Sequence, residues 1–197
     1  MQTDKSFQKI LQQIQSRVKV NETEFAQFAA KCRQLVLKKK EIWQAAGETG
    51  QSLAFINEGI MRQYYTREGE EKTDDFYAEG EFVGNYVSYL QQQPSRMAIQ
   101  ALSACELLVI DFDALQQLYQ LSPSVERFAR LIAEQKLISL HERTAGFLLD
   151  SPQERYAQLL EQKPNIHARV PLYLIAQYLG IHPESLSRIR ARMAPKN

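Results

Sequence analysis

The sequence predicts an α+β fold in which an N-terminal antiparallel β-roll of the jelly-roll type precedes a long helix and a C-terminal helix-turn-helix. Three observations predict this order. Turn signals arrive about every ten residues over positions 33–84, helical periodicity returns after Ile110, and Gly180 separates two short amphipathic segments. Short β-rich runs between regularly spaced turns are typical of an antiparallel sandwich or barrel.

The composition is that of an ordinary folded protein. The chain has 197 residues, of which 44% are hydrophobic and 24% charged, and its length suits one domain or two small ones. Cys32 and Cys105 are its two cysteines, which excludes a disulfide framework and a four-thiolate metal or iron–sulfur site within one chain. The N-terminus lacks the apolar core of a signal peptide, and no apolar run approaches the ~18 residues of a membrane helix. We therefore expect a soluble, cytoplasmic protein with no membrane partner.

Two helices are expected before the β-rich region. Apolar residues recur at spacings of three and four over residues 5–18, and Asn21 with Glu24 three positions later has the pattern of a helix cap, which starts a second helix ending near Lys31. The expected strands lie in the runs LVLKKKEIW, SLAFINEG, IMRQYYT, TDDFYA, RMAIQAL and CELLVI, with a short helix over residues 85–91 between the fourth and fifth runs.

Helices are expected again after Ile110. Asp111 can cap a helix over residues 112–119, and Ser122 followed by proline predicts the start of a long helix that runs from Pro123 to about Leu149. Three further pairs repeat this pattern of a residue followed by proline at a helix start, and they predict shorter helices: Ser151-Pro152, Val170-Pro171 and His182-Pro183.

The long helix carries more apolar surface than a connector needs. That surface either packs on the β-roll or pairs with its twin in a homodimer. We expect the second arrangement, with Val125, Phe128 and Ile132 in the two-fold interface.

Charge is distributed unevenly along the chain. Basic residues exceed acidic ones by five from Lys163 to the C-terminus, whereas the first 162 residues carry a net charge of −4. A basic terminal block is the pattern expected of a segment that contacts phosphates, although a solvated basic tail has the same charge count.

Residues 175–193 have the pattern of a helix-turn-helix. Ala176 is small where a second helix would cross, Gly180 permits a positive φ in the turn, and Ile181 can fill the space between the helices. The inner face of the second helix is expected to consist of Leu186, Ile189 and Met193.

The outward face of the second helix carries groups that read and hold DNA. Glu184, Arg188 and Arg192 share this face, and Ser185 and Ser187 flank it. A carboxylate accepts from cytosine N4, a guanidinium forks onto guanine O6 and N7, and hydroxyls bind phosphate. We expect Arg188 to read a base, and Arg192 and the more distant Lys196 to neutralise phosphates. The alternative is a helical hairpin with a charged, solvated face.

At this point the sequence resembles the Crp/Fnr family of bacterial transcription regulators. The string EGEFVG at residues 79–84, followed by SRMAIQAL and CELLVIDFDAL, is similar to the family's phosphate-binding cassette, and QYLGIHPESLSRIR is similar to its DNA-reading helix pair. Glu184 and Arg188 match that helix, whereas Pro183 replaces its first arginine, so the half-site should differ.

The resemblance implies an organisation and a set of partners. It implies a cyclic-nucleotide-binding-like β-roll sensor over residues 1–120, a dimerisation helix over 121–149 and a DNA-binding unit over 150–197. It also implies a homodimer that binds double-stranded DNA at an inverted repeat and acts with RNA polymerase. The runner-up is a sensory or protein-interaction module that does not read DNA.

The resemblance further implies a small-ligand site in the roll. The matching positions are Gly80, Glu81, Gly84, Asn85, Arg96 and Met97. Asn85 stands at the place of a ribose-binding glutamate, and Met97 at the place of a serine that contacts the phosphate. We therefore expect no tight binding of cyclic AMP and assign no cofactor. Two alternatives stay open: an unknown small ligand, or a roll without an effector in which Arg96 bridges surface carboxylates.

Enzyme chemistry finds no support in the sequence. The three histidines, His141, His167 and His182, all follow the β-rich region, so a metal-binding barrel that draws histidines from its strands would lack its ligands. GxSxG, Walker and HExxH patterns are absent from the sequence. We expect no catalytic residues and no metal site.

Overall fold

The computed structural model describes residues 5–193; Lys196, one of the expected phosphate contacts, lies outside the described residues. The helices are α1 (Lys5–Gln15), α2 (Glu22–Lys31), α3 (Tyr86–Gln91), α4 (Phe112–Leu121), α5 (Pro123–Leu149), α6 (Pro152–Gln162), α7 (Ile166–Arg169), α8 (Leu172–Leu179) and α9 (Pro183–Met193). The strands are β1 (Cys32–Leu37), β2 (Ile42–Gln44), β3 (Ser52–Glu58), β4 (Met61–Arg67), β5 (Glu70–Tyr77), β6 (Phe82–Val83), β7 (Met97–Ala101) and β8 (Cys105–Asp111).

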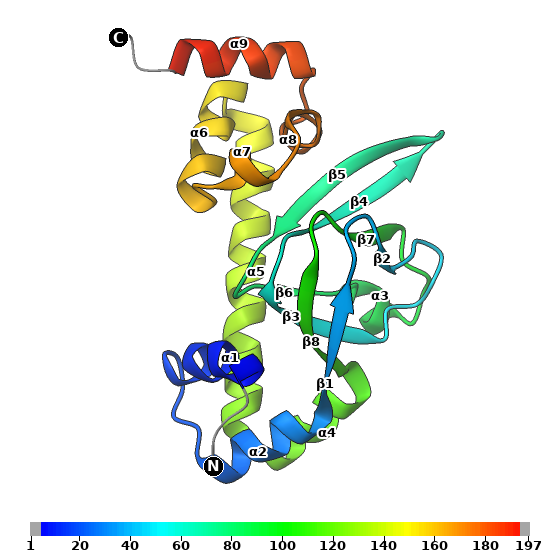
Figure 1. Ribbon diagram of the computed structural model, residues 1–197, viewed down its shortest axis with the longest axis vertical. Helices are drawn as coiled ribbons and strands as arrows, with labels where there is room; N and C mark the ends of the chain where they lie inside the picture. Colours follow the sequence, from blue (N-terminus) through cyan, green and yellow to red (C-terminus); the bar gives the residue numbers. More distant parts are fainter. Residues whose placement is uncertain (1–4, 194–197) are drawn as a thin grey trace.

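The strands form two antiparallel sheets of four strands each, in the orders β1-β8-β3-β6 and β2-β7-β4-β5 (Figure 1). The space between the sheets is filled by side chains such as Ile56, Met61, Ile99 and Val109, which are all fully buried. The antiparallel β-roll predicted from the turn rhythm is thereby confirmed. The expected strand RMAIQAL is shorter in the structure, where β7 begins at Met97 and ends at Ala101.

The register of the second sheet fixes which residues share an end of the roll. Met61 in β4 pairs with Tyr77 in β5 and with Ala101 in β7, whereas Tyr65 pairs with Met97. Residues next to Met61 and residues next to Met97 therefore lie at opposite ends of β4, about four residues or 13 Å apart.

The N-terminal helices and the first part of α5 cover the first sheet. Asn21 accepts from the Glu24 amide and Glu24 accepts from the Asn21 amide, which is the reciprocal cap that the sequence predicted. The Ser122 hydroxyl, which caps α5, also donates to Glu24 Oε1 at 2.7 Å. The two helix starts are thus joined through one carboxylate. Asp111 stands at the start of α4 but its side chain makes no capping hydrogen bond.

Two of the three expected dimer residues of α5 are buried within the protomer. Val125 and Phe128 are buried within the protomer, 3% and 5% exposed, and the Phe128 ring meets Phe82 of the roll at 5.9 Å. Ile132 is half-buried against the same core. The apolar surface of Val125 and Phe128 thus belongs to the protomer's own core, whereas Ile132 lies at the edge of that core.

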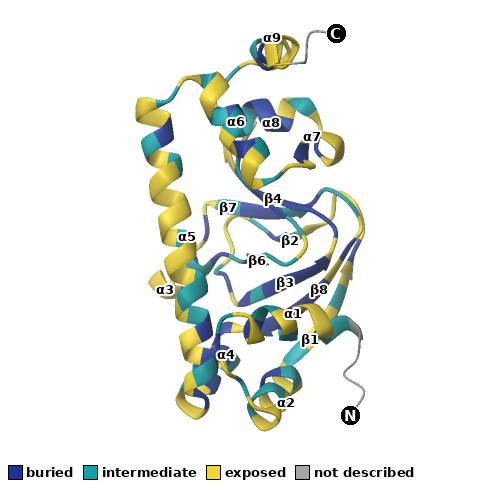
Figure 2. Ribbon diagram, turned by 90° about the vertical axis from the view of Figure 1, so that its left-hand side faces the viewer, coloured by how far each residue is buried: buried dark blue, intermediate teal, exposed yellow. Residues whose placement is uncertain are grey.

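The second half of α5 extends past the roll to the C-terminal helices, and Figure 2 shows it exposed along one side. Two cations on its other side hold the β4–β5 hairpin: Lys136 binds Asp75 at 2.5 Å, and Arg143 binds Asp74 at 2.9 Å. The hairpin, the long helix and the C-terminal helices therefore meet at one place (Figure 1).

The C-terminal helices α6 to α9 share one hydrophobic core with part of the roll. Their buried residues, Leu159, Leu174 and Ile175 among them, pack with Ile60 and Phe76 from the second sheet. The Tyr178 ring lies 5.5 Å from that of Phe76, and the Thr73 hydroxyl donates to Gln177 at 2.9 Å. This packing places α8 directly over β5.

Two ion pairs strengthen this contact between the roll and the C-terminal helices. Glu79 binds both terminal nitrogens of Arg169 at 2.7 Å, and Lys163 binds both oxygens of Glu81 at 2.7 and 2.8 Å. The Arg169 guanidinium, with help from the backbone amide of Gly59, lowers the pKa of the Glu79 carboxyl to about 2.

We expect Glu79→Gln to lower the free energy of unfolding by about 1 kcal/mol at pH 7, because about a third of the carboxylate is exposed and water screens the pair. The folded pKa lies below the unfolded value. The stabilisation is therefore present above about pH 4.5 and is lost as the pH falls toward 2. Urea unfolding at pH 7 and at pH 3 measures the difference between the two proteins, which should shrink at the lower pH.

Glu68→Gln is the matched control, because Glu68 pairs with Arg67 at the exposed hairpin tip. It should change the free energy of unfolding by less than about 0.5 kcal/mol at either pH. A Glu79→Gln effect of equal size at both pH values would show that packing, and not charge, holds this contact.

Candidate nucleic-acid interface and roll interior

The turn between α8 and α9 spans residues 180–182. Gly180 has φ +69° and ends α8 in the left-handed conformation, and the Ile181 amide donates to Ala176 O at 3.0 Å. A Cβ on Gly180 would lie 3.1 Å from Cε1 of Phe147 in α5. Both the backbone conformation and the close approach of α5 therefore favour glycine here.

The inner faces of α8 and α9 pack together through apolar residues. Ala176, Leu179 and Leu186 are at most 1% exposed, and Ile189 is 9% exposed. Ile181 is half-buried against this group, as expected for a residue between the two helices. Met193 was expected on the inner face, but it is 37% exposed, because α9 projects beyond α8 at its C-terminal end (Figure 1).

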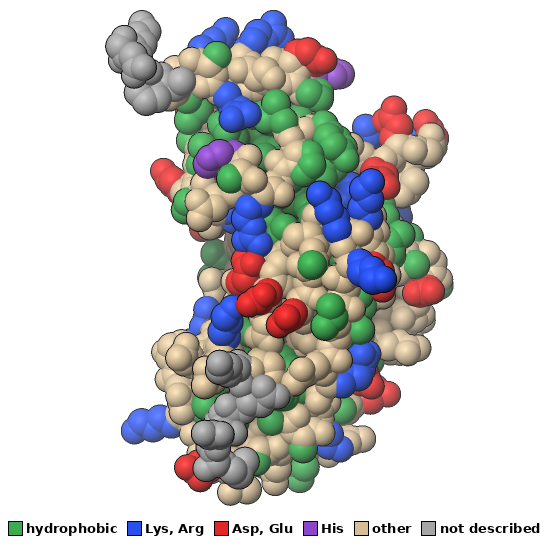
Figure 3. Space-filling model, in the orientation of Figure 1, with side chains coloured by type: hydrophobic (Ala, Val, Ile, Leu, Met, Phe, Trp, Pro, Cys, Tyr) green, Lys and Arg blue, Asp and Glu red, His purple; other side chains and the backbone are tan. Residues whose placement is uncertain are grey.

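The outer face of α9 presents charged and polar groups to solvent. Glu184, Ser187, Arg188 and Arg192 are exposed, and Ser185 is half-buried. Nη2 of Arg188 donates to Ser185 Oγ at 3.3 Å, so these two side chains lie next to each other on the helix surface. Figure 3 shows basic side chains along the outer surface of α9 and an acidic one near its start. The structure thus brings the expected DNA-binding residues together on one accessible surface.

The interior of the roll contains a hydrogen-bonded group of polar side chains centred on Asn85. Asn85 is 2% exposed; its Oδ1 accepts from Gln63 at 2.9 Å and its Nδ2 donates to Met97 O at 3.2 Å. The backbone N–H of Asn85 donates to Oε1 of Gln44 at 3.0 Å. Both polar atoms of the Asn85 side chain therefore have partners within the protein.

This group of polar side chains continues to the long helix. The Tyr77 hydroxyl donates to Gln63 Oε1 at 2.9 Å and accepts from Lys136 of α5 at 3.1 Å. Burial raises the pKa of Tyr77 well above its ordinary value, and the carboxylate of Asp75 adds to the shift. The phenol is consequently neutral and acts as a hydrogen-bond donor that joins the roll interior to α5.

The other expected ligand residues point to different places. Arg96 is exposed at the end of the roll marked by Met97 and Tyr65, and no ion pair involves it within residues 5–193. Glu81 faces Lys163 of the C-terminal helices. Asn85 and Met97 therefore lie together, whereas Glu81 and Arg96 lie elsewhere. Within residues 5–193, Arg96 does not bridge surface carboxylates.

The two glycines of the cassette have structural roles. Gly80 adopts φ +85° in the turn between β5 and β6. A Cβ on Gly84, just after β6, would come within 2.8 Å of Ser52 O in β3. The chain after β6 therefore approaches the β3 backbone closely at this point. Both observations explain the glycines of EGEFVG through the roll's own geometry.

We expect cyclic AMP to bind at best weakly to this roll. The side-chain amide of Asn85 brings no charge to a ribose hydroxyl, and it is already hydrogen-bonded to Gln63 and to the Met97 carbonyl. Loss of one charge-assisted hydrogen bond reduces affinity by about 1.5 to 3 kcal/mol, or roughly ten- to hundredfold. Titration calorimetry with cyclic AMP measures this directly, and submicromolar binding would contradict the expectation.

Comparison with known proteins gives one family match, and it falls on the roll. A family model described as the cyclic nucleotide-binding domain matches residues 34–122. This segment is therefore similar to a cyclic nucleotide-binding domain. It contains all the strands except the start of β1, and it ends where α5 begins. No curated protein gives a significant match to the sequence.

Solved structures extend the similarity beyond the cyclic nucleotide-binding domain. A mutant of CooA from Carboxydothermus hydrogenoformans is 18% identical, with a TM-score of 0.70 over 96% of this chain and 84% of that one. The c-di-GMP responsive global regulator CLP of Xanthomonas campestris is 20% identical, with a TM-score of 0.68 over 88% and 91%. A putative regulator of the Crp/Fnr family from Eubacterium rectale is 18% identical, with a TM-score of 0.66 over 88% and 83%. The chain therefore has the Crp/Fnr fold.

Within residues 5–193, no three His, Cys, Asp or Glu side chains are grouped so that they could hold a metal ion. In the same part of the chain, no helix has the length and apolar character needed to cross a membrane.

Proposed function

We propose that the protein is a sequence-specific DNA-binding transcription regulator of the Crp/Fnr type that acts as a homodimer on an inverted-repeat operator. The observation that carries this proposal is the outer face of α9, where Glu184, Ser187 and Arg188 are all exposed on a helix held by a buried inner face. The Crp/Fnr fold of the chain supports it.

The dimensions and chemistry of α9 suit the major groove. Its 11 residues span about 16 Å, and the B-DNA major groove is about 12 Å wide. Arg188 can fork onto guanine O6 and N7, and Glu184 can accept from cytosine N4. Arg192 and the serine hydroxyls are suited to phosphates. In this arrangement α8 and α9 are a helix-turn-helix.

Exposed apolar residues on the second half of α5 support a homodimer. Leu137, Leu140 and Leu148 are 68%, 44% and 80% exposed. With Ala133 and Thr144 they recur every three or four positions, which is the spacing of a helix pair. We propose that this stripe, together with Ile132 at its edge, packs against its copy on a second chain.

The division of labour follows from these surfaces. We propose that residues 1–120 form the sensor unit, 121–149 the dimerisation helix and 150–197 the DNA-binding unit. RNA polymerase is the proposed protein partner, as befits a bacterial transcription regulator in the cytoplasm. The groups displayed by α9 are those of a binding surface, and we assign the protein no catalytic activity.

Salt-dependent binding to duplex DNA tests this proposal. Fluorescence anisotropy with a random-sequence duplex at 50 to 200 mM salt should show a linear fall of log affinity with log salt concentration. The slope of that line should be about −0.9 for each neutralised phosphate. With Arg190 and Arg192 on each of two chains, several phosphates should be neutralised. No binding at 50 mM salt would instead favour a sensory or protein-interaction module.

A further inference from the structure

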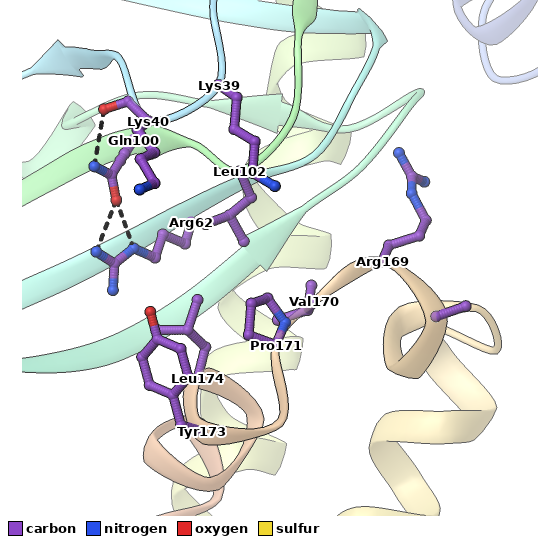
Figure 4. Close-up of a pocket in the computed structure, with 11 residues that line it drawn as sticks. Lys39, Lys40, Arg62, Gln100, Leu102, Arg169, Val170, Pro171, Tyr173 and Leu174 are labelled. Carbon is purple, nitrogen blue, oxygen red and sulfur yellow. Dashed lines mark hydrogen bonds between the residues drawn. The ribbon is translucent and has the colours of Figure 1, made fainter.

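A cavity of about 470 Å³ lies between the roll and the C-terminal helices (Figure 4). One wall is the outer side of the second sheet, with Arg62 and Gln100, and the other is the segment from α7 into α8, with Arg169 and Tyr173. This cavity is outside the roll interior where a cyclic-nucleotide ligand was sought. It is also separate from the outer face of α9.

Arg62 supplies a buried cation to this cavity. The residue is 4% exposed; its Nε and Nη2 donate to Gln100 Oε1 at 3.0 and 2.7 Å, and Nη2 also donates to Glu71 at 2.5 Å. Its Nη1 is buried and has no hydrogen-bond partner in the described structure. In Figure 4 this third nitrogen points away from Gln100, toward the side where Tyr173 and Leu174 lie.

Buried donors are nearly always satisfied by protein, water or a ligand, so an unpartnered one marks a place for an acceptor. Arg143 Nε and Arg155 Nε are also buried without a partner, but Arg62 differs from them because it lines the same cavity as Lys39 and Lys40. A guanidinium presents five N–H donors and no acceptor, and Arg62 already binds Glu71, so the acceptor that fits best is a second anion.

Further positive charge lines the same cavity. Lys39 and Lys40 are exposed at its rim, and neither forms an ion pair within residues 5–193. The Lys40 carbonyl accepts from Gln100 Nε2 at 2.9 Å, which fixes the turn that carries both lysines. The paired Arg169 completes a group of four cations around one space.

The opposite wall offers a helix start and an apolar surface. The helix α8 begins at Leu172, just after Pro171, and the positive end of its dipole favours an anion, although the amides of Leu174 and Ile175 already donate to Pro171 O. Beside this helix start lie Leu102, Val170 and Leu174, which give the cavity an apolar part.

We propose that this cavity is a binding site for a small molecule that carries one or two phosphate groups. The phosphate is held by Arg62 Nη1 together with Lys39 and Lys40, and the apolar part of the molecule lies against Val170 and Leu174. Because the roll and the C-terminal helices each supply one wall, the bound molecule stabilises their docked arrangement. The proposal does not depend on DNA binding.

Titration calorimetry with inorganic pyrophosphate, at constant ionic strength, tests the site. The unmodified protein should bind pyrophosphate saturably at one site per chain, and its Tm should rise with pyrophosphate concentration, as for any ligand of the folded state. The double variant Lys39→Gln, Lys40→Gln should bind at least about tenfold more weakly, because it loses two charge-assisted contacts. Both lysines are exposed, so the variant should fold normally.

Lys38→Gln is the matched control, because Lys38 is exposed and adjacent in sequence but does not line the cavity. Its affinity for pyrophosphate should stay within about twofold of the unmodified protein. An equal loss in Lys38→Gln and in the double variant would indicate non-specific charge and overturn the proposal. Undetectable binding at millimolar pyrophosphate would overturn it too, and so would loss of binding in Arg96→Gln alone, which would place the phosphate in the roll cassette.

Discussion

Arg188→Ala should weaken binding to a selected operator by about 1 to 3 kcal/mol per half-site and relax the preference at one base pair, with little effect on random DNA. Arg188 is one helical turn after Glu184 and is exposed near the N-terminal half of α9, the part of a recognition helix that contacts base edges. Anisotropy titrations with selected and random duplexes measure both effects. Equal losses on the two duplexes would contradict a base-reading role.

Arg192→Ala is the matched control for this prediction. Arg192 is an exposed arginine in the last turn of the same helix, where contact with the backbone is expected. The substitution should weaken binding to selected and random duplexes alike. It should also reduce the slope of log affinity against log salt concentration by about one unit per lost phosphate contact. If neither variant changes the affinity, α8 and α9 form an interaction hairpin and do not read DNA.

Leu137→Glu should dissociate the homodimer. Leu137 is 68% exposed in the middle of the apolar stripe on α5, and two-fold symmetry would place the two glutamates close together in a water-poor interface. Unpaired buried charge costs about 3 to 5 kcal/mol, which weakens association by more than about a hundredfold. Sedimentation velocity at micromolar concentration should show a dimer for the unmodified chain and a monomer for the variant.

Val36→Glu tests whether this effect is specific. Val36 is 69% exposed on β1, so it matches Leu137 in exposure but lies on the roll (Figure 1). It should leave the dimer intact. A monomer for the unmodified chain, or dissociation by both variants, would contradict the proposed interface.

Local signals in the sequence were sufficient to predict most elements of the fold. The reciprocal cap at Asn21 and the Ser122-Pro123 start of α5 depend on neighbouring residues alone, and both are confirmed. The turn at Gly180 likewise follows from a single backbone conformation.

The sequence could not predict which side of α5 meets the protomer's own core. Val125, Phe128 and Leu137 are all apolar, yet the first two are covered by the roll and the N-terminal helices while Leu137 is exposed. Helical periodicity identifies an apolar stripe but carries no information about which element covers each turn. The point along α5 at which its apolar residues change from buried to exposed depends on where the roll ends.

The outward residues of α9 could be predicted, because a helical wheel with a known inner face determines its outer face. The family resemblance groups Asn85, Glu81 and Arg96 in one cassette, whereas the structure places them in the roll interior, beside Lys163 and in solvent. Arg62 was missed because nothing in the strand run IMRQYYT reveals that helices more than 100 residues later cover its outer face. Such long-range contacts leave no local pattern.

Selection of bound sequences from a random DNA pool with the full chain tests the central claim most directly. Two α9 helices related by a dimer axis should enter successive major grooves about 34 Å apart, so the account predicts an inverted repeat with half-site centres about 10 base pairs apart. Recovery of no preferred sequence, or of a site without two-fold symmetry, would contradict it.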